Sequence, residues 1–159
     1  MQFTYHIPTR IVFGNGSLDR LHNEKLPGKR ALIVISAGKS TRANGYLAQL
    51  EAQLTKAGIS FVVFDKILPN PIKDHVMEGA LLCKNEKCDF VIGLGGGSTI
   101  DSAKGIAIMA TNERDLWSYI DGGTGEGKPI PVWPLPIVAI TTTAGTGTEA
   151  DPWLVITKK

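Results

Sequence analysis

Three consecutive glycines separate an apolar run from a segment with helical spacing, in the stretch DFVIGLGGGSTIDSAKGIA at residues 89–107. Glycine allows a backbone to approach a ligand closely, and the first amides of a helix attract anions. Gly95, Gly96, Gly97 and Ser98 are therefore candidates to bind a diphosphate. Strong structural signals on both sides of the glycines argue against a flexible linker. A tight strand-to-helix turn that binds no ligand is the simpler alternative.

Ser98 and Asp101 have the spacing of a capping box, in which two side chains satisfy free amides at a helix start. We expect this role for Asp101, and its carboxylate near the diphosphate turn also makes it a candidate cofactor-binding residue. The dinucleotide pattern G-x-G-x-x-G is only partly met, because Gly93 and Gly95 are present but Ser98 stands in place of the third glycine. The turn thus differs from the usual Rossmann fingerprint.

A second polar turn, AITTTAGTGTEAD at residues 139–151, follows another apolar run. Threonine hydroxyls and glycine amides at the carboxyl end of a strand suit a ribose or a phosphate. The alternative is that threonine is present here for its high β propensity.

The elements that must position these turns are four short β-branched runs and the helical segments between them. The runs lack polar alternation, which predicts strands covered on both faces: residues 31–35, 61–64, 90–94 and 136–140. Apolar residues at helical spacing lie between the first two runs, between the second and third, and from Thr99 to about Ala110. Alternating strands and helices predict an α/β fold, a doubly wound, mostly parallel Rossmann-like sheet.

The first residues follow a different pattern. Phe3, Tyr5 and Ile7 alternate with polar residues, and RIVFG follows at residues 10–14. This pattern predicts an N-terminal antiparallel ribbon at the edge of the sheet.

Composition limits the function classes. A chain of 159 residues with 43% hydrophobic residues suits one domain, and a net charge of +2 without a dense basic block argues against nucleic acid. No window reaches the roughly 20 apolar residues of a membrane span, and the start lacks a signal-peptide core, so we expect a cytoplasmic protein. Cys83 and Cys88 match neither a zinc nor a redox spacing and are expected to be reduced structural thiols.

The sequence AGKS at residues 37–40 imitates the end of a P-loop, which would indicate an NTPase or a kinase. That pattern requires glycine at position 33, where Ile33 lies within an expected strand. The loop would then be too short to wrap a triphosphate. Magnesium-dependent ATP affinity that requires Lys39 would support this alternative.

Four motifs in order give the chain a family resemblance: RIVFGNGSLDRL at residues 10–21, PNP at 69–71, GGGSTIDSAK at 95–104 and TTAGTGTE at 142–149. Together they resemble the N-terminal domain of iron-containing alcohol dehydrogenases over essentially the whole chain. The resemblance implies that the glycine turn binds the diphosphate of a dinucleotide. It also implies that Thr142, Thr143 and Thr146 lie against the nicotinamide half, and Asn70 joins these candidate contacts. Thr141 stands where the family often has proline.

The resemblance further implies hydride transfer between a small alcohol or aldehyde and the cofactor, with iron or another divalent metal held by a second, helical domain. The histidines His6, His22 and His75 have no ligand-like spacing. We therefore expect residues 1–159 to form the dinucleotide-binding domain alone, without catalytic or metal-binding residues and inactive by itself. The family also implies a homodimer through the N-terminal ribbon. A standalone nucleotide-binding or interaction module is the alternative, and the gene beyond the codon for Lys159 would distinguish the two.

The loop ISAGKSTR at residues 35–42 bears on the choice of dinucleotide. NAD-preferring members of the resembled family place an aspartate there to hold the ribose 2′-hydroxyl, and no acid occurs between Ile35 and Asn44. Instead, Gly38 leaves room, Lys39 and Arg42 supply positive charge, and Ser40 can donate a hydrogen bond. This predicts a preference for NADP(H) over NAD(H), unless the two basic residues are simply solvated.

Overall fold

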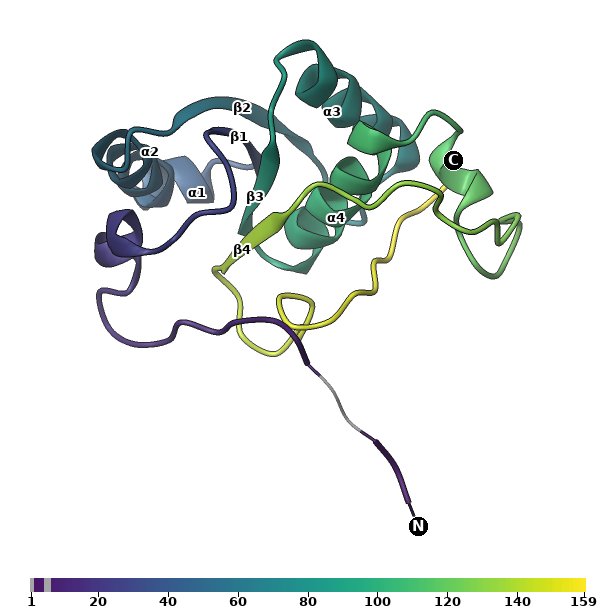
Figure 1. Ribbon diagram of the computed structural model, residues 1–159, viewed down its shortest axis with the longest axis horizontal. Helices are drawn as coiled ribbons and strands as arrows, with labels where there is room; N and C mark the ends of the chain where they lie inside the picture. Colours follow the sequence, from purple (N-terminus) through teal and green to yellow (C-terminus); the bar gives the residue numbers. More distant parts are fainter. Residues whose placement is uncertain (1, 5–6) are drawn as a thin grey trace.

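A parallel four-stranded sheet forms the centre of the computed structural model, which describes residues 2–4 and 7–159 (Figure 1). Its strands lie in the order β2-β1-β3-β4, with the bounds β1 Arg30–Ser36, β2 Ser60–Ile67, β3 Phe90–Gly95 and β4 Ile137–Thr141. All three pairings are parallel. The predicted doubly wound, parallel sheet is confirmed, and each strand overlaps the run that predicted it.

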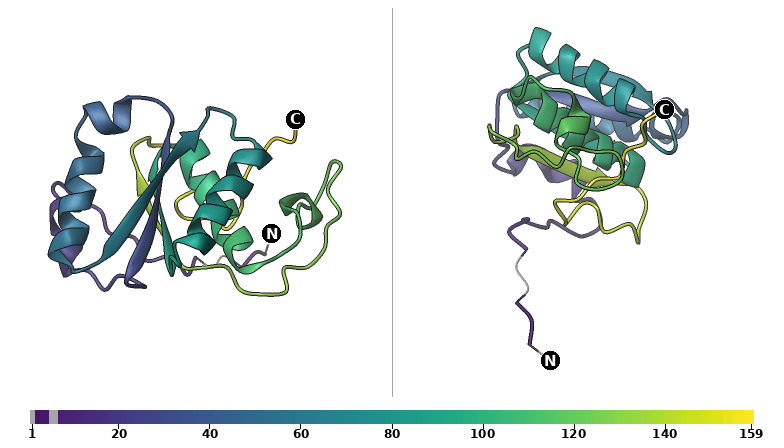
Figure 2. Two further views of the ribbon diagram at one scale, coloured as in Figure 1. Left: turned by 90° about the horizontal axis from the view of Figure 1, so that it is seen from above. Right: turned by 90° about the vertical axis from the view of Figure 1, so that its right-hand side faces the viewer.

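Helices cover both faces of this sheet. The α-helices are α1 Ser40–Ala43, α2 Tyr46–Lys56, α3 Lys73–Asn85 and α4 Gly97–Thr111, and 3-10 helices span Leu18–Asn23 and Leu116–Ser118. Figure 2 shows α2 on one side of the sheet and α3 with α4 on the other. This arrangement explains why the central strands lack polar alternation.

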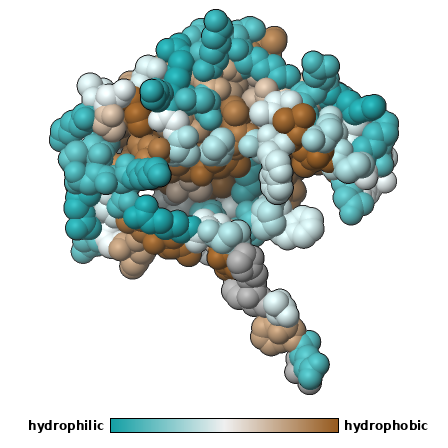
Figure 3. Space-filling view, in the orientation of Figure 1, coloured by the Kyte–Doolittle hydropathy of each residue, from teal (hydrophilic) through white to brown (hydrophobic). Residues whose placement is uncertain are grey.

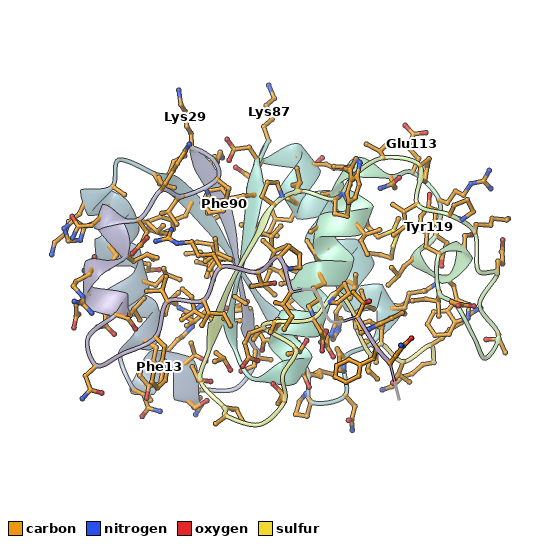
Figure 4. The ribbon with its side chains drawn as sticks, turned by 60° about the horizontal axis from the view of Figure 1, so that its bottom comes forward. Phe13, Lys29, Lys87, Phe90, Glu113 and Tyr119 are labelled. Atoms are coloured by element: carbon orange, nitrogen blue, oxygen red, sulfur yellow. The ribbon has the colours of Figure 1, made fainter. Side chains whose placement is uncertain are left out.

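The core is divided by the sheet into two apolar layers. Ile33 and Ile35 of β1 pack with Leu50 of α2 on one face, whereas Leu32 and Val34 face the layer formed with α3 and α4. All residues of β3 are buried, whereas β2 and β4 at the edges keep exposed positions. Figure 4 shows Phe90 inside the molecule.

Gly93 sets the distance between β3 and α4. A Cβ atom at Gly93 would lie 3.0 Å from the Cβ of Ala103 and 3.3 Å from the Cα of Ile100. Only a residue without a side chain allows this close packing. The start of α4 is thereby held directly above the end of β3.

The expected N-terminal ribbon is not formed within this chain: residues 2–4 and 7–13 hold no strand, and Tyr5 and His6 lie outside the described residues. Side-chain hydrogen bonds attach this segment to the rest of the chain instead. The Thr9 hydroxyl donates to the carbonyl of Ala150 at 3.2 Å, and Arg10 bonds to Glu24. Strands need a neighbouring backbone to pair with, and in Figure 1 the segment runs beside loops rather than along a sheet edge.

Cys83 and Cys88 are both free and buried, in agreement with the structural role expected for them. A hydrogen bond with Cys88, together with burial, raises the pKa of the Cys83 thiol.

Among the helices of the described residues, none has the length and apolar character required to cross a membrane.

Candidate cofactor-binding site

The sheet changes its winding direction between β1 and β3. From β1 the chain passes through α2 to β2 on one side, and from β3 it passes through α4 to β4 on the other. Ligands of open α/β sheets bind at such a point, outside the carboxyl ends of the strands. A cavity of about 230 Å³ lies there, lined by Ser36, Ser40, Thr41, Leu68, Pro69, Gly95, Gly96, Gly97, Ser98, Thr99, Thr142 and Thr143.

The glycine turn, residues Gly95–Gly97, leaves no room for side chains. A Cβ atom at Gly95 would lie 2.7 Å from Thr99 Oγ1, and one at Gly96 would lie 3.0 Å from Thr143 Oγ1. At Gly97 the nearest atom would be Thr146 Cγ2 at 3.3 Å. The turn therefore presents bare backbone to the cavity.

Helix α4 begins at this turn without a side-chain cap. Its N-cap residue is Gly96, in an extended conformation, and no side chain bonds to the free amides of the first turn. These amides and the helix dipole favour a negative group at this end of the helix. The turn, the open helix end and the cavity together form an anion-binding arrangement.

The predicted capping box is wrong. Because Gly96 is the N-cap, Ser98 already lies inside α4, and its carbonyl accepts a hydrogen bond from Ser102 at 2.7 Å. Asp101 is one turn further along, so its carboxylate points to the chain after β4 instead: it accepts hydrogen bonds from the Thr148 hydroxyl and from the amide of Val155. The glycines allow the helix to start earlier than the serine, which removes the spacing that a capping box requires.

The threonine loop, residues 141–148, lies across the glycine turn. The amide of Thr142 donates to the carbonyl of Gly95 at 2.9 Å, and the Thr141 hydroxyl donates to the carbonyl of Thr143 at 3.0 Å. Thr142 and Thr143 line the cavity, whereas Thr146 contacts the position of Gly97 from outside it.

A larger cavity of about 420 Å³ adjoins the first one through Ser36 and extends along the loop after β1, as its lining shows: Ser36, Ala37, Gly38, Lys39, Arg42, Ala43 and Asp65. Gly38 and Lys39 line this cavity as the sequence suggested, and Ser40 lines the smaller one. The three candidates of this loop thus lie around one continuous surface.

Asp65 is the residue of this cavity that sequence reasoning missed. It comes from β2, and its carboxylate accepts a hydrogen bond from Arg42 at 2.8 Å. Both side chains are about half exposed, at 52% for Arg42 and 50% for Asp65. The charge expected of Arg42 is therefore already paired. The sequence signal that could have identified Asp65 is its position directly after the second predicted strand. Many dinucleotide-binding folds carry an acidic residue at this place.

Asn70 does not line either cavity. It has a positive φ of 54° and is exposed in the turn after β2, next to Pro69, which does line the smaller cavity.

The P-loop alternative fails on geometry, because Ile33 is buried within β1 and only residues 37–39 separate β1 from α1.

The histidines within the described residues do not converge. His22 Nδ1 is 2.6 Å from Gln53 Oε1, whereas His75 is at the start of α3, and His6 lies outside the described residues. The described part of the chain contains no group of three or more His, Cys, Asp or Glu side chains suited to a metal ion. The described residues therefore do not fit an iron centre.

The parallel sheet, its switch-point cavity and the glycine turn define a Rossmann-like, dinucleotide-binding type of fold. The family model described as iron-containing alcohol dehydrogenase matches residues 8–159. The chain belongs to the iron-containing alcohol dehydrogenase family, as the motifs predicted.

Individual relatives agree with this assignment. The chain is 38% identical to 1,3-propanediol dehydrogenase of Citrobacter freundii, over 98% of this chain and 39% of that protein. Among solved structures, NADH-dependent butanol dehydrogenase A of Thermotoga maritima has a TM-score of 0.88 at 37% identity, over 99% of this chain and 38% of that one. The archaeal alcohol dehydrogenase ADH/D1 from a Red Sea brine pool has a TM-score of 0.90 at 38% identity, over 99% and 41%. The chain thus spans about two fifths of its relatives' length.

Proposed function

We propose that this chain binds the nicotinamide dinucleotide of an alcohol dehydrogenase. The observation that carries the proposal is the glycine turn at the switch point, where a Cβ atom at any of the three glycines would meet a threonine at 2.7–3.3 Å. Backbone amides of Gly95–Ser98 bind the diphosphate, assisted by the dipole of α4. Thr142 and Thr143 contact the adjoining part of the cofactor from the cavity wall, whereas Thr146, which packs against Gly97, and Asn70, next to Pro69, lie outside the cavity lining.

When bound, the nicotinamide ring supplies or accepts a hydride, which interconverts a small alcohol and its aldehyde or ketone. The part assigned to the described residues is to bind and orient the dinucleotide. Polarising an alcohol oxygen requires a Lewis acid or a general acid, and the described residues contain no group of three or more His, Cys, Asp or Glu side chains that could hold a metal ion. We therefore propose that these 159 residues alone do not turn over alcohols.

We propose a preference for NADP(H) over NAD(H). Support comes from Lys39, which lines the larger cavity, and from Ser40 at the border of the smaller one. Three curated relatives, all butanol dehydrogenases, carry names that state dependence on NADH, and a methanol dehydrogenase is named as NAD-dependent. The preference for NADP(H) proposed for this chain therefore depends on Lys39 and Ser40, because the guanidinium of Arg42 is already bonded to Asp65.

Calorimetric titration with NADPH and NADH tests both proposals. We expect NADPH to bind about tenfold more tightly, a difference of about 1.4 kcal/mol, and the Lys39→Ala, Ser40→Ala double variant to lose that difference. Lys29→Ala is the matched control, because Lys29 points outward at the opposite, amino-terminal end of the strands (Figure 4). Equal dissociation constants would contradict the NADP(H) preference, and no binding of either dinucleotide would contradict the function.

We also propose that the chain associates as a homodimer through its N-terminal segment. Several large apolar side chains there are exposed, including Phe3 at 83%, Ile11 at 67% and Phe13 at 96%. Figure 3 shows further hydrophobic areas on the main body of the molecule, above the extended N-terminal tail. Exposed apolar surface of this kind is typical of interfaces.

We also propose a cytoplasmic location for the protein. Support comes from the two free cysteines, which a reducing compartment would keep as thiols.

A further inference from the structure

Lys104 is a buried cation that the proposed binding of the dinucleotide does not use. It lies on α4, and only 9% of its side chain is exposed. Its ammonium donates to Thr148 Oγ1 at 2.7 Å, to Asp151 Oδ1 at 3.0 Å and to the carbonyl of Trp153 at 2.5 Å. Thr148 is the last residue of the threonine loop, and the other two acceptors belong to the segment that directly follows it. Burying a charge is costly unless its hydrogen bonds are satisfied, and here all three acceptors come from residues 148–153.

Asp101 makes the same connection from the preceding turn of the helix. Its carboxylate accepts from the Thr148 hydroxyl and, at 3.1 Å, from the amide of Val155, and it lies 4.0 Å from the Lys104 ammonium. Thr148 therefore donates to Asp101 and accepts from Lys104. The two side chains, one helical turn apart, fix the chain after the threonine loop to α4.

The threonine loop is consequently held at both ends. At its start, the amide of Thr142 bonds to Gly95, and at its end Thr148 bonds to the Asp101–Lys104 pair. Between these points the loop contains Gly145 and Gly147, both with positive φ, and residues 142–147 are exposed. Helix α4 thus carries the glycine turn at its first residue and the anchor of the threonine loop further along.

We infer that Lys104 and Asp101 are positioning residues: they hold Thr142 and Thr143 in register with the glycine turn, and so set the affinity for the nicotinamide half of the dinucleotide. This inference rests on the proposed function for the identity of the ligand. The anchoring of the loop itself can be measured without any ligand.

The test compares Lys104→Met with Lys73→Met in the same chain. Lys73 pairs with Asp115 and is also largely buried, at 20% exposure, but it lies outside both cavities. In the ligand-free chain, exchange of the Thr142 amide, which bonds to the carbonyl of Gly95, should become about tenfold faster in Lys104→Met and stay unchanged in Lys73→Met. Asp151→Asn, at a residue 42% exposed, removes one charge from the network and should give a smaller increase at the same amide.

The affinities for NADH and for ADP distinguish a positioning role of Lys104 from general damage to the fold. In Lys104→Met, the dissociation constant for NADH should rise about tenfold, whereas that for ADP, which lacks the nicotinamide half, should change less than about twofold. Equal losses for ADP and NADH, or unchanged exchange of the Thr142 amide in both Lys104→Met and Asp151→Asn, would overturn the inference. If the unmodified chain binds no dinucleotide, the proposed function fails, and with it the assignment of the nicotinamide half. The exchange measurement would still decide whether the loop is anchored.

Discussion

The guanidinium of Arg42 bonds to the carboxylate of Asp65 at 2.8 Å, so a basic residue of α1 is paired with an acid from β2. The pair lines the larger cavity beside Lys39. For the proposed NADP(H) cofactor, this pairing would limit the positive charge available to the 2′-phosphate.

Asp65→Asn should therefore increase the preference for NADPH. With its partner uncharged, Arg42 becomes free to form a charge-assisted hydrogen bond with the extra phosphate, which corresponds to about a tenfold gain in NADPH affinity relative to NADH. Calorimetry with both dinucleotides measures the change. In the Asp65→Asn, Arg42→Ala double variant the gain should disappear; if it persists, Arg42 is not its source.

Gly95→Ala should destabilise the fold at the glycine turn. The added methyl group would lie 2.7 Å from Thr99 Oγ1 and 2.9 Å from Thr99 Cβ, and Cβ cannot move without moving the helix. We expect the free energy of unfolding to fall by about 1–3 kcal/mol in urea titrations.

Gly38→Ala is the control for this change. Its added methyl would meet Ser36 Oγ at 3.5 Å, an ordinary contact, so its effect on unfolding should stay within about 0.5 kcal/mol. Equal stability of the two alanine variants would show that the close contact at Gly95 is relieved without cost.

Asp115 should make stability depend on pH in the acid range. Desolvation raises the pKa of this carboxyl, but the hydrogen bonds from Lys73 and from the amide of Trp117 outweigh it, and the net pKa is lowered from 3.8. A lowered folded-state pKa gives a contribution that is present above pH 3.8 and is lost as the pH falls through the folded-state value. The pair is partly exposed, so the contribution is small, about 0.5 kcal/mol.

Urea unfolding of the parent chain and of Asp115→Asn checks this expectation, because asparagine retains an acceptor for the amide of Trp117. The stability difference between the two should be present at pH 6 and shrink below about pH 4. The hydrogen bond with Asp115 raises the pKa of Lys73, so the same difference should also shrink as the pH rises above 10.5. A difference that is constant from acid to alkaline pH would argue against the ion pair.

Deletion of residues 1–9 should reduce the mass in solution from that of a dimer to that of a monomer. The expected cause is the loss of the apolar N-terminal segment, including Phe3 at 83% exposure. Light scattering at several concentrations measures the mass, and Phe13→Ser in the undeleted chain tests whether exposed apolar surface near the segment contributes. An unchanged subunit count after the deletion would exclude this segment as the interface.

Local sequence patterns determined the sheet and its glycine turn. Continuous apolar runs such as residues 31–35 favour strands buried on both faces, and the spacing of Leu47, Leu50 and Leu54 favours a helix against one of those faces. Glycines between a strand and a helix specify a turn without side chains. These features depend on near neighbours along the chain, and the sequence was sufficient to predict them.

Tertiary structure alone decided the partners of the charged side chains. Arg42 and Asp65 are 23 positions apart, and Asp101 and Thr148 are 47 apart, so nothing in the local pattern around either acid indicated its contact. Asp101 had the spacing of a cap, but Gly96 started the helix earlier and left its carboxylate free to hold the chain after β4. The physical reason is that a strand or a helix is specified by the periodic pattern of apolar residues close together in the sequence. An ion pair depends instead on which elements the fold brings together.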